Sequence, residues 1–201
     1  SLHAGMMVED VVIEIKDLSN PIFEMQASSS AQLNTINNFL ISSPIDKYFG
    51  GMLRNISSSG EAEYFVGVSM PLRVKERAKY DYTTNFRLTD VNLDIEGLNP
   101  KIQNINGLAS ISRHDISTES MTGSWIGSDI KISARKAFTN EKDLSGVISV
   151  TGTTEINDID KNFNSSLSES LSGSTDYTLK INVPRYSENP QPFFINLNAN
   201  I

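Results

Sequence analysis

The sequence predicts a mainly β protein, built as an extended, strongly twisted antiparallel sheet with a few short helices. Apolar and polar residues alternate with a period of two through most of the chain, which is typical of half-buried strands. Helical spacing appears only ahead of two of these segments. Hydrophobic residues make up 38% of the chain, so many strands have enough polar residues to keep one face in water.

The clearest strand covers residues 62–72, where every even position is apolar or aromatic. The even-numbered stripe continues through residues 80–88. The apolar positions then become odd over residues 91–95. This change of parity predicts a bulge or a tight turn at Thr89 and Asp90.

Other strands show the same alternation on either side of turn residues. Two are predicted at residues 11–16 and 23–27, separated by Asn20 and Pro21. Later strands are predicted around residues 102–111, 115–122, 129–136, 146–153, 176–183 and 192–198.

Three helices are predicted, near residues 30–40, 44–56 and 156–170. Pro44 suits the first turn of the second helix, and Gly173 is a stop signal after the third. Apolar residues recur at helical spacing in each segment. Such helices would cover one end or one flank of the sheet.

The chain contains an internal repeat in which residues 44–71 resemble residues 158–184. The matching positions are Gly60 with Gly173, Tyr64 with Tyr177, and Pro71 with Pro184. The repeated unit is a short helix, a polar turn with glycine, an alternating strand and a proline. A repeated unit of this length favours an extended architecture that works through its surface. We expect both copies to form a helix followed by a strand, with the two tyrosines on the same face.

Composition narrows the classes of function. The formal net charge is -7, which argues against a nucleic-acid partner, because phosphate binding needs a concentrated basic surface. There is no cysteine, so disulfides and thiol catalysis are excluded. No window approaches the length of a membrane-spanning helix. Residues 1–7 are expected to be a cloning remnant or a disordered start, and residues 8–201 one continuous unit.

The sequence offers only weak evidence for catalytic or metal-binding groups. The acidic residues from Asp158 to Glu169 imitate the spacing of a calcium loop, but Phe163 stands where that loop needs glycine, so a helix start is favoured. His114 and Asp115 are adjacent in a strand and would point to opposite faces. Ser124 lacks the sequence of a nucleophile elbow. We therefore expect no enzyme, no metal and no cofactor.

The chain resembles the AsmA-like bacterial envelope proteins, and is most similar to their YhdP-type branch. The resemblance rests on the order of several motifs: residues 41–45 before a short helix, Gly60 and the alternating strand to residues 70–72, and the segment 125–132. It implies a groove-shaped, taco-like β-sheet in the periplasm, in a full-length protein anchored in the inner membrane. It also implies phospholipid transport between the two membranes and a role in envelope integrity, with acyl chains shielded in the groove and other envelope proteins as possible partners.

The residues expected to line such a groove lie on the alternating strands of the two repeat copies. They are Tyr64, Val66, Val68, Met70, Leu72, Tyr177, Leu179 and Ile181. An ordinary sheet core would produce the same stripe. The alternative function is a non-enzymatic interaction or spacer module that binds an envelope protein or a glycan. A charge at Val68 should block a groove, whereas Ser69→Asp on the opposite face should be tolerated.

Overall fold

The computed structural model describes residues 7–16, 18–42, 51–73, 75, 79–112, 116–136, 144–184 and 194–199. These residues form one antiparallel sheet of ten strands, in which each strand pairs with its neighbours in the sequence. The strands are β1 (Met7–Lys16), β2 (Ile22–Gln32), β3 (Ile56–Pro71), β4 (Asp81–Ile95), β5 (Ile102–Ser112), β6 (Ile116–Trp125), β7 (Ser128–Lys136), β8 (Leu144–Glu155), β9 (Ser174–Pro184) and β10 (Phe194–Ala199).

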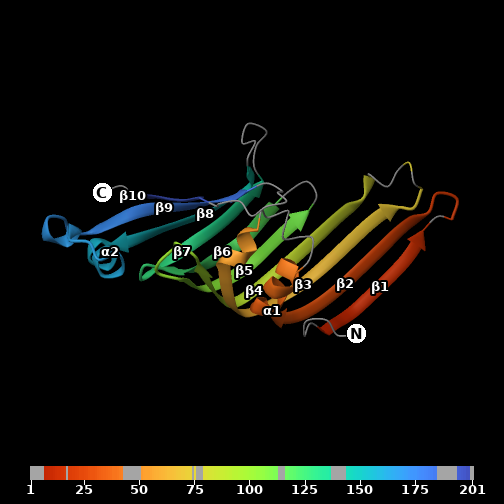
Figure 1. Cartoon of the computed structure of the whole chain (residues 1–201), viewed down its shortest axis with the longest axis horizontal. Coiled ribbons are helices and arrows are strands. Elements are labelled where there is room, and N and C mark those ends of the chain that lie inside the picture. The colour runs from red at the N-terminus through yellow and green to blue at the C-terminus, as the bar shows by residue number, and fades with distance from the viewer. Residues whose placement is uncertain are drawn as a thin grey trace.

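The predicted fold class is confirmed. Figure 1 shows an elongated, twisted sheet that runs from β1 on one side to β10 on the other and does not close on itself. Among the described strands, β1 pairs only with β2 and β10 only with β9. An open, twisted sheet of this kind follows from a chain whose polar residues keep one face of most strands in water.

Bulges interrupt four central strands at similar heights. Gly60 in β3 has φ +104° and lies opposite Asp90 in β4, whose φ is +48°. The same arrangement recurs in the next pair of strands, where Gly107 in β5 has φ +141° and lies opposite Ser120 in β6, with φ +50°. The predicted irregularity at Thr89 and Asp90 is therefore a bulge. Bulges increase the local twist and bend the sheet.

The predicted helix at residues 30–40 corresponds to α1 (Leu33–Ser42). The prediction at residues 44–56 is wrong at its end. Its first part falls outside the described residues, while Met52–Asn55 form the short 3-10 helix η2 and Ile56 already pairs with Ile95 in the sheet. Gly51, with φ +77°, precedes η2, and strand pairing of Ile56 overrides the helical spacing.

The third predicted helix is real but shorter than expected. α2 covers Ile156–Phe163 and ends at Asn164, which adopts a left-handed φ of 52°. A 3-10 turn, η4 (Leu167–Glu169), replaces the rest of the prediction up to residue 170. Ser and Asn in this segment favour local turns over a continued helix.

The helices α1, η2, α2 and η4 lie near the same end of the strands. We call this the helix end, where the odd-numbered strands begin, and we call the opposite end, where they finish, the distal end. In Figure 1, α1 lies over the middle of the sheet and α2 lies beside the end of β8. Asn37 of α1 donates hydrogen bonds to the carbonyl oxygens of Leu53 (3.3 Å) and Ile56 (2.9 Å), so it ties α1 to the start of β3.

Candidate functional site

One face of the sheet is apolar from β1 to β10. The register shows this, because residues directly opposite each other in an antiparallel pair share a face. We define the apolar face by the residues Val11, Ile13, Ile15, Phe23, Met25, Ala27, Val66, Val68, Met70, Tyr82, Thr84, Phe86, Val91, Leu93, Ile105, Ala109, Met121, Trp125, Ile130, Ile132, Ile148, Val150, Tyr177, Leu179, Ile181, Val183, Ile195 and Leu197.

The other face is mostly polar and is called the polar face. It carries the lysine, arginine, aspartate and glutamate residues of the strands with one exception, Lys136, along with many serines, threonines and asparagines. A few apolar residues also belong to it, such as Val12, Phe65 and Val147. The polar face is therefore suited to contact with water, and the apolar face to contact with an apolar ligand.

The apolar face is buried towards the C-terminal strands and accessible at the N-terminal ones. One cluster of buried residues includes Val91, Ile105, Trp125 and Leu179. Met52 of η2 belongs to the same cluster. On β1, in contrast, Val11, Ile13 and Ile15 are 52%, 59% and 53% exposed. The face is thus a buried core over the central and C-terminal strands and an accessible apolar surface on β1, although Leu197 on the last strand is 45% exposed.

The predicted groove residues divide between these two parts. Four of them lie on the apolar face of β3 and are half-buried: Tyr64, Val66, Val68 and Met70. Leu72 lies just past β3, where its backbone N–H donates to the carbonyl of Pro21 at 2.8 Å. The three from the second copy, Tyr177, Leu179 and Ile181, are buried in the core, at 4%, 0% and 4% exposure.

Tyr64 and Tyr177, the matched tyrosines of the repeat, both belong to the apolar face. Tyr64 is opposite Phe86, and Tyr177 is opposite Gly152, which is opposite Ile130. The matched glycines also share a conformation, with φ +104° at Gly60 and +100° at Gly173.

Sequence analysis missed the most accessible part of the apolar face. Val11, Ile13 and Phe23 were predicted to lie in alternating strands, yet alternation alone does not reveal which strands share a face. Thr84 was missed because a threonine carries no apolar signal, although it lies between Val66 and Ile111 on this face. The bulges also shift the apolar positions from even to odd residue numbers, so the alternation cannot be followed from one strand to the next by residue number alone.

An aromatic cluster closes the helix end of the core. The ring of Trp125 meets those of Phe163 and Tyr177 edge-on, with centroids 6.2 Å and 5.3 Å apart. The Trp125 indole N–H donates to the carbonyl of Pro100 at 2.7 Å, and the Tyr177 hydroxyl donates to the carbonyl of Trp125 at 3.3 Å. Burial raises the pKa of Tyr177 to about 12. Each buried polar group in this cluster is therefore satisfied, and Trp125 packs in the core.

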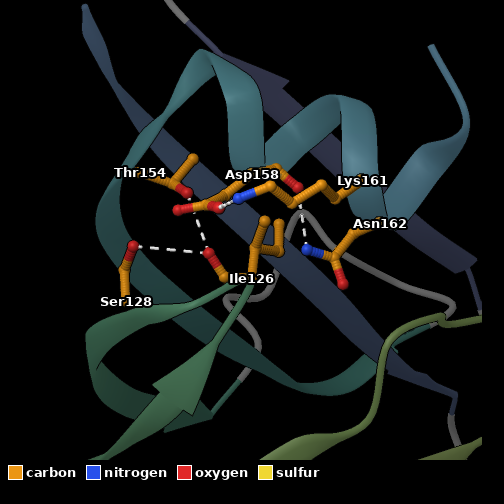
Figure 2. A network of polar contacts seen from close by, with 6 residues as sticks. All are labelled: Ile126, Ser128, Thr154, Asp158, Lys161 and Asn162. Atoms are coloured by element: carbon orange, nitrogen blue, oxygen red, sulfur yellow. Dashed lines mark hydrogen bonds and ion pairs between the residues drawn. The ribbon is translucent and has the colours of Figure 1, made fainter.

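Hydrogen bonds tie the turn between β6 and β7 to β8, and α2 has its own polar contacts close by (Figure 2). Thr154 and Ser128 donate from their hydroxyls to the carbonyl of Ile126, at 2.9 Å and 3.4 Å. On α2, Lys161 pairs with the carboxylate of Asp158 at 2.8 Å, and Asn162 donates to the Asp158 carbonyl at 2.7 Å. The two bonds to its carbonyl hold Ile126 in a left-handed conformation, with φ +51°, that is costly for a β-branched residue.

Two hollows lie beside the helix end. An apolar hollow of about 220 Å³ lies between α2, η4, β9 and β10, with Ile159, Phe163 and Leu197 among its lining residues. A larger depression of about 990 Å³ lies mainly on the polar face and is lined by residues such as Asp129, Lys131 and Asp176.

The predicted helix start at Asp158 is confirmed, since α2 contains this residue in its first turn. Asp160 accepts hydrogen bonds from the Ser165 hydroxyl and from the backbone N–H groups of Leu167 (2.9 Å) and Ser168 (2.8 Å). These bonds, led by the one from Ser165, lower the pKa of Asp160. The two carboxylates therefore stabilise a helix and the turn after it.

His114 and Asp115 lie outside the described residues. Within the described part of the chain, no group of three or more histidine, aspartate or glutamate residues is arranged to hold a metal ion. The helices of that part are all too short or too polar to cross a membrane.

Comparison with known proteins places the chain in a family. No curated protein and no solved structure matches it. The family described as YhdP protein matches residues 3–201, which is nearly the whole chain. The motif order seen in the sequence agrees with this match, and the chain belongs to the YhdP protein family.

Proposed function

We propose that this chain is a periplasmic segment of an AsmA-like protein that shields lipid acyl chains along its apolar face. In this role it would contribute to phospholipid transport between the inner and outer membranes and to envelope integrity. The YhdP family is an envelope protein family, which supports the setting. The proposal involves no enzymatic step and no cofactor.

The observation that carries the proposal is the continuity of the apolar face. It extends over neighbouring strands without interruption, and on β1 to β3 its side chains are half-buried or exposed. Burying a methylene group against such a surface contributes roughly 0.8 kcal/mol, so a long acyl chain gains from lying there. A polar face on the other side keeps the sheet wetted while it carries the lipid.

Adjacent threonines on opposite faces provide a matched test. Thr84 lies on the apolar face between Val66 and Ile111, while Thr83 lies on the polar face between Gly67 and Ser112. Thr84→Asp places a charge in the path of the acyl chains, where it is costly unless it reaches water, and Thr83→Asp does not. Photocrosslinking to a phospholipid with a reactive group in its chain should therefore fail in Thr84→Asp and persist in Thr83→Asp.

The thermal midpoint of both variants must be measured on the same samples. A folded Thr84→Asp protein that still crosslinks as well as the wild type would refute the proposal for this part of the face. The structure makes this pair better than Val68→Asp with Ser69→Asp, because Ser69 lies between Glu24 and Asp81. A third carboxylate there would destabilise the sheet by itself.

A second candidate, an interaction module, is favoured by the accessible edge of β1. Among the described strands β1 pairs on one side only, and its aliphatic residues Val12 and Ile13 are 52% and 59% exposed on opposite faces. A strand of a partner protein could add to such an edge through backbone hydrogen bonds. This candidate would be favoured if the wild-type protein binds a partner protein but does not crosslink to lipid.

A further inference from the structure

The apolar face carries a single charged residue in the described strands, Lys136. This residue ends β7 at the distal end, opposite Gly146 of β8, which in turn is opposite Val183 of β9. The side chain of Lys136 is exposed. A cation at the margin of the apolar face differs from the charges elsewhere on the described strands, which lie on the polar face.

Further cations lie at the same distal margin, just after β3. Arg73, Lys75 and Lys79 are all exposed, and Arg73 donates a hydrogen bond to the carbonyl of Ser19. Tyr80 follows them with 42% exposure, and its ring stacks on that of Tyr82 with centroids 6.4 Å apart. Tyrosine rings and long cationic side chains are typical of the level where lipid chains meet their headgroups.

Among the residues that the structure describes, the carboxylates of the distal end point away from this margin. Glu14, Glu24 and Asp81 belong to the polar face by their register, and Lys16 forms ion pairs with Glu24 (2.5 Å) and Glu14 (3.7 Å). Most of the other described acidic residues gather towards the helix end. They include Asp90, Asp94, Glu96, Asp129, Glu155, Asp158, Asp160, Glu169 and Asp176.

We propose that lipids lie on the apolar face in one orientation, with an anionic phosphate headgroup at the distal margin and the acyl chains directed towards the helix end. Lys136, Arg73, Lys75 and Lys79 attract the phosphate, and the acidic helix end repels it. This inference rests on the proposed function and adds to it the class of headgroup and the direction of the bound lipid.

Two labelled forms of phosphatidylglycerol test the orientation. One carries a photoreactive group in the headgroup and the other at the end of an acyl chain. The headgroup label should react with peptides that contain residues 73–80 or Lys136, and the chain label should react with peptides nearer the helix end. A headgroup label that reacts mainly with residues 94–101 or 155–169 would overturn the proposal.

A matched pair of lysine variants tests the charge. Lys136→Glu reverses the charge on the apolar face, while Lys180→Glu makes the same change on the polar face of β9, where Lys180 is also exposed. Lys136→Glu should lower headgroup crosslinking of phosphatidylglycerol several-fold and leave that of zwitterionic phosphatidylcholine unchanged. Lys180→Glu should change neither lipid. Equal losses in the two variants, or no loss in Lys136→Glu, would contradict the proposal.

The outcomes separate this inference from the proposed function. If neither label reacts with the folded wild-type protein, the lipid-binding function itself fails. If the chain label reacts and the headgroup label shows no preference for the distal margin, only the orientation fails. Inorganic phosphate at the lipid concentration should not compete, because it lacks the chains that hold the lipid. Competition by phosphate would show a simple anion site instead.

Discussion

Two glycines with nearly the same backbone conformation have different surroundings. Gly60 has φ +104°, and a Cβ atom there would lie 2.6 Å from the carbonyl oxygen of Asp90 and 2.7 Å from the Cα of Val91. Gly173 has φ +100°, and a Cβ atom there would meet nothing within 4 Å. The pair therefore separates the cost of the backbone conformation from the cost of the clash.

Alanine at either glycine should destabilise the protein, and alanine at Gly60 should do so much more. The unusual φ costs about 1–3 kcal/mol in both variants. Gly60→Ala also forces two strands apart at a bulge, which adds a further cost of about 1–3 kcal/mol. Urea unfolding of the two variants measures the difference. Equal losses of unfolding free energy would mean that the strands at the bulge rearrange around the added Cβ atom without a further cost.

The buried Tyr177 hydroxyl links stability to alkaline pH. Burial raises its pKa from 10.0 to about 12 in the folded protein. Between these two values the unfolded chain loses the proton first, so the stability contributed by the protonated form is lost as the pH rises. Wild-type unfolding free energy should fall more steeply above pH 10 than that of Tyr177→Phe. Parallel pH profiles for the two proteins would show that the tyrosine does not titrate as its burial predicts.

At the scale of single residues, alternation predicted which side chains point away from each other but not how deeply each is buried. Val66 and Leu179 occupy matching positions in the repeat, yet Val66 is half-buried and Leu179 is fully buried. The difference depends on how the sheet bends and what packs above it. Neither property is encoded in the local pattern of a strand.

Among the elements, the connection from α2 to η4 depends on one carboxylate. Asp160 accepts hydrogen bonds from the Ser165 hydroxyl and from the N–H groups of Leu167 and Ser168, and these lower its pKa. A lowered pKa means that the folded state gains stability above the ordinary value of 3.8 and loses it as the pH falls below that value. Acid should therefore loosen this connection before it unfolds the sheet.

Asp160→Asn should have the same local effect at neutral pH, because an amide is a weaker acceptor than a carboxylate. The amide signals of Leu167 and Ser168 in NMR spectra should shift and lose protection from exchange, while those of β8 and β9 stay the same. In the wild type, the same two signals should stay in place as the pH falls through the ordinary value of 3.8 and move only at lower pH, because the pKa of Asp160 is lowered in the folded protein. If they respond to acid equally in Asp160→Asn, the carboxylate is not the group responsible.

Strands were easier to predict than helices and turns. Polar and apolar alternation located the long strands, because a half-buried strand imposes it over many residues. The predicted helix to Ile56 failed because Ile56 pairs with Ile95, a partner far away in the sequence. The turn at Ile126 and Gly127 carries no usual signal either, since isoleucine rarely adopts a positive φ and is held here by Thr154 and Ser128.

On the scale of the whole molecule, the apolar face appears only when all the strands are assembled. Its stripe lies on even positions in residues 62–70 and on odd positions in residues 91–95 and 177–183. The bulges at Asp90 and Ser120 reconcile these parities by adding one residue to a strand. A candidate site spread over ten strands therefore required the register, whereas a compact motif would have been visible in the sequence.

A lipid that occupies this face should stabilise the whole sheet, because the unfolded chain offers no continuous apolar surface to bind it. A ligand that binds only the folded state at one hundred times its dissociation constant contributes about 2.7 kcal/mol. For a chain of this length, each kcal/mol raises the melting temperature by about 2–4 °C. Short-chain phosphatidylglycerol below its micelle concentration should therefore raise the wild-type melting temperature by roughly 5–10 °C at saturation.

The same titration distinguishes occupation of the apolar face from other lipid effects. Thr83→Asp should retain the rise in melting temperature, whereas Thr84→Asp should lose most of it, because only Thr84 lies on the apolar face. The rise should follow lipid concentration as mass action requires and then saturate. A rise of the same size in Thr84→Asp would mean that the lipid stabilises the sheet from somewhere else. The accessible edge at β1 would then be the surface to examine.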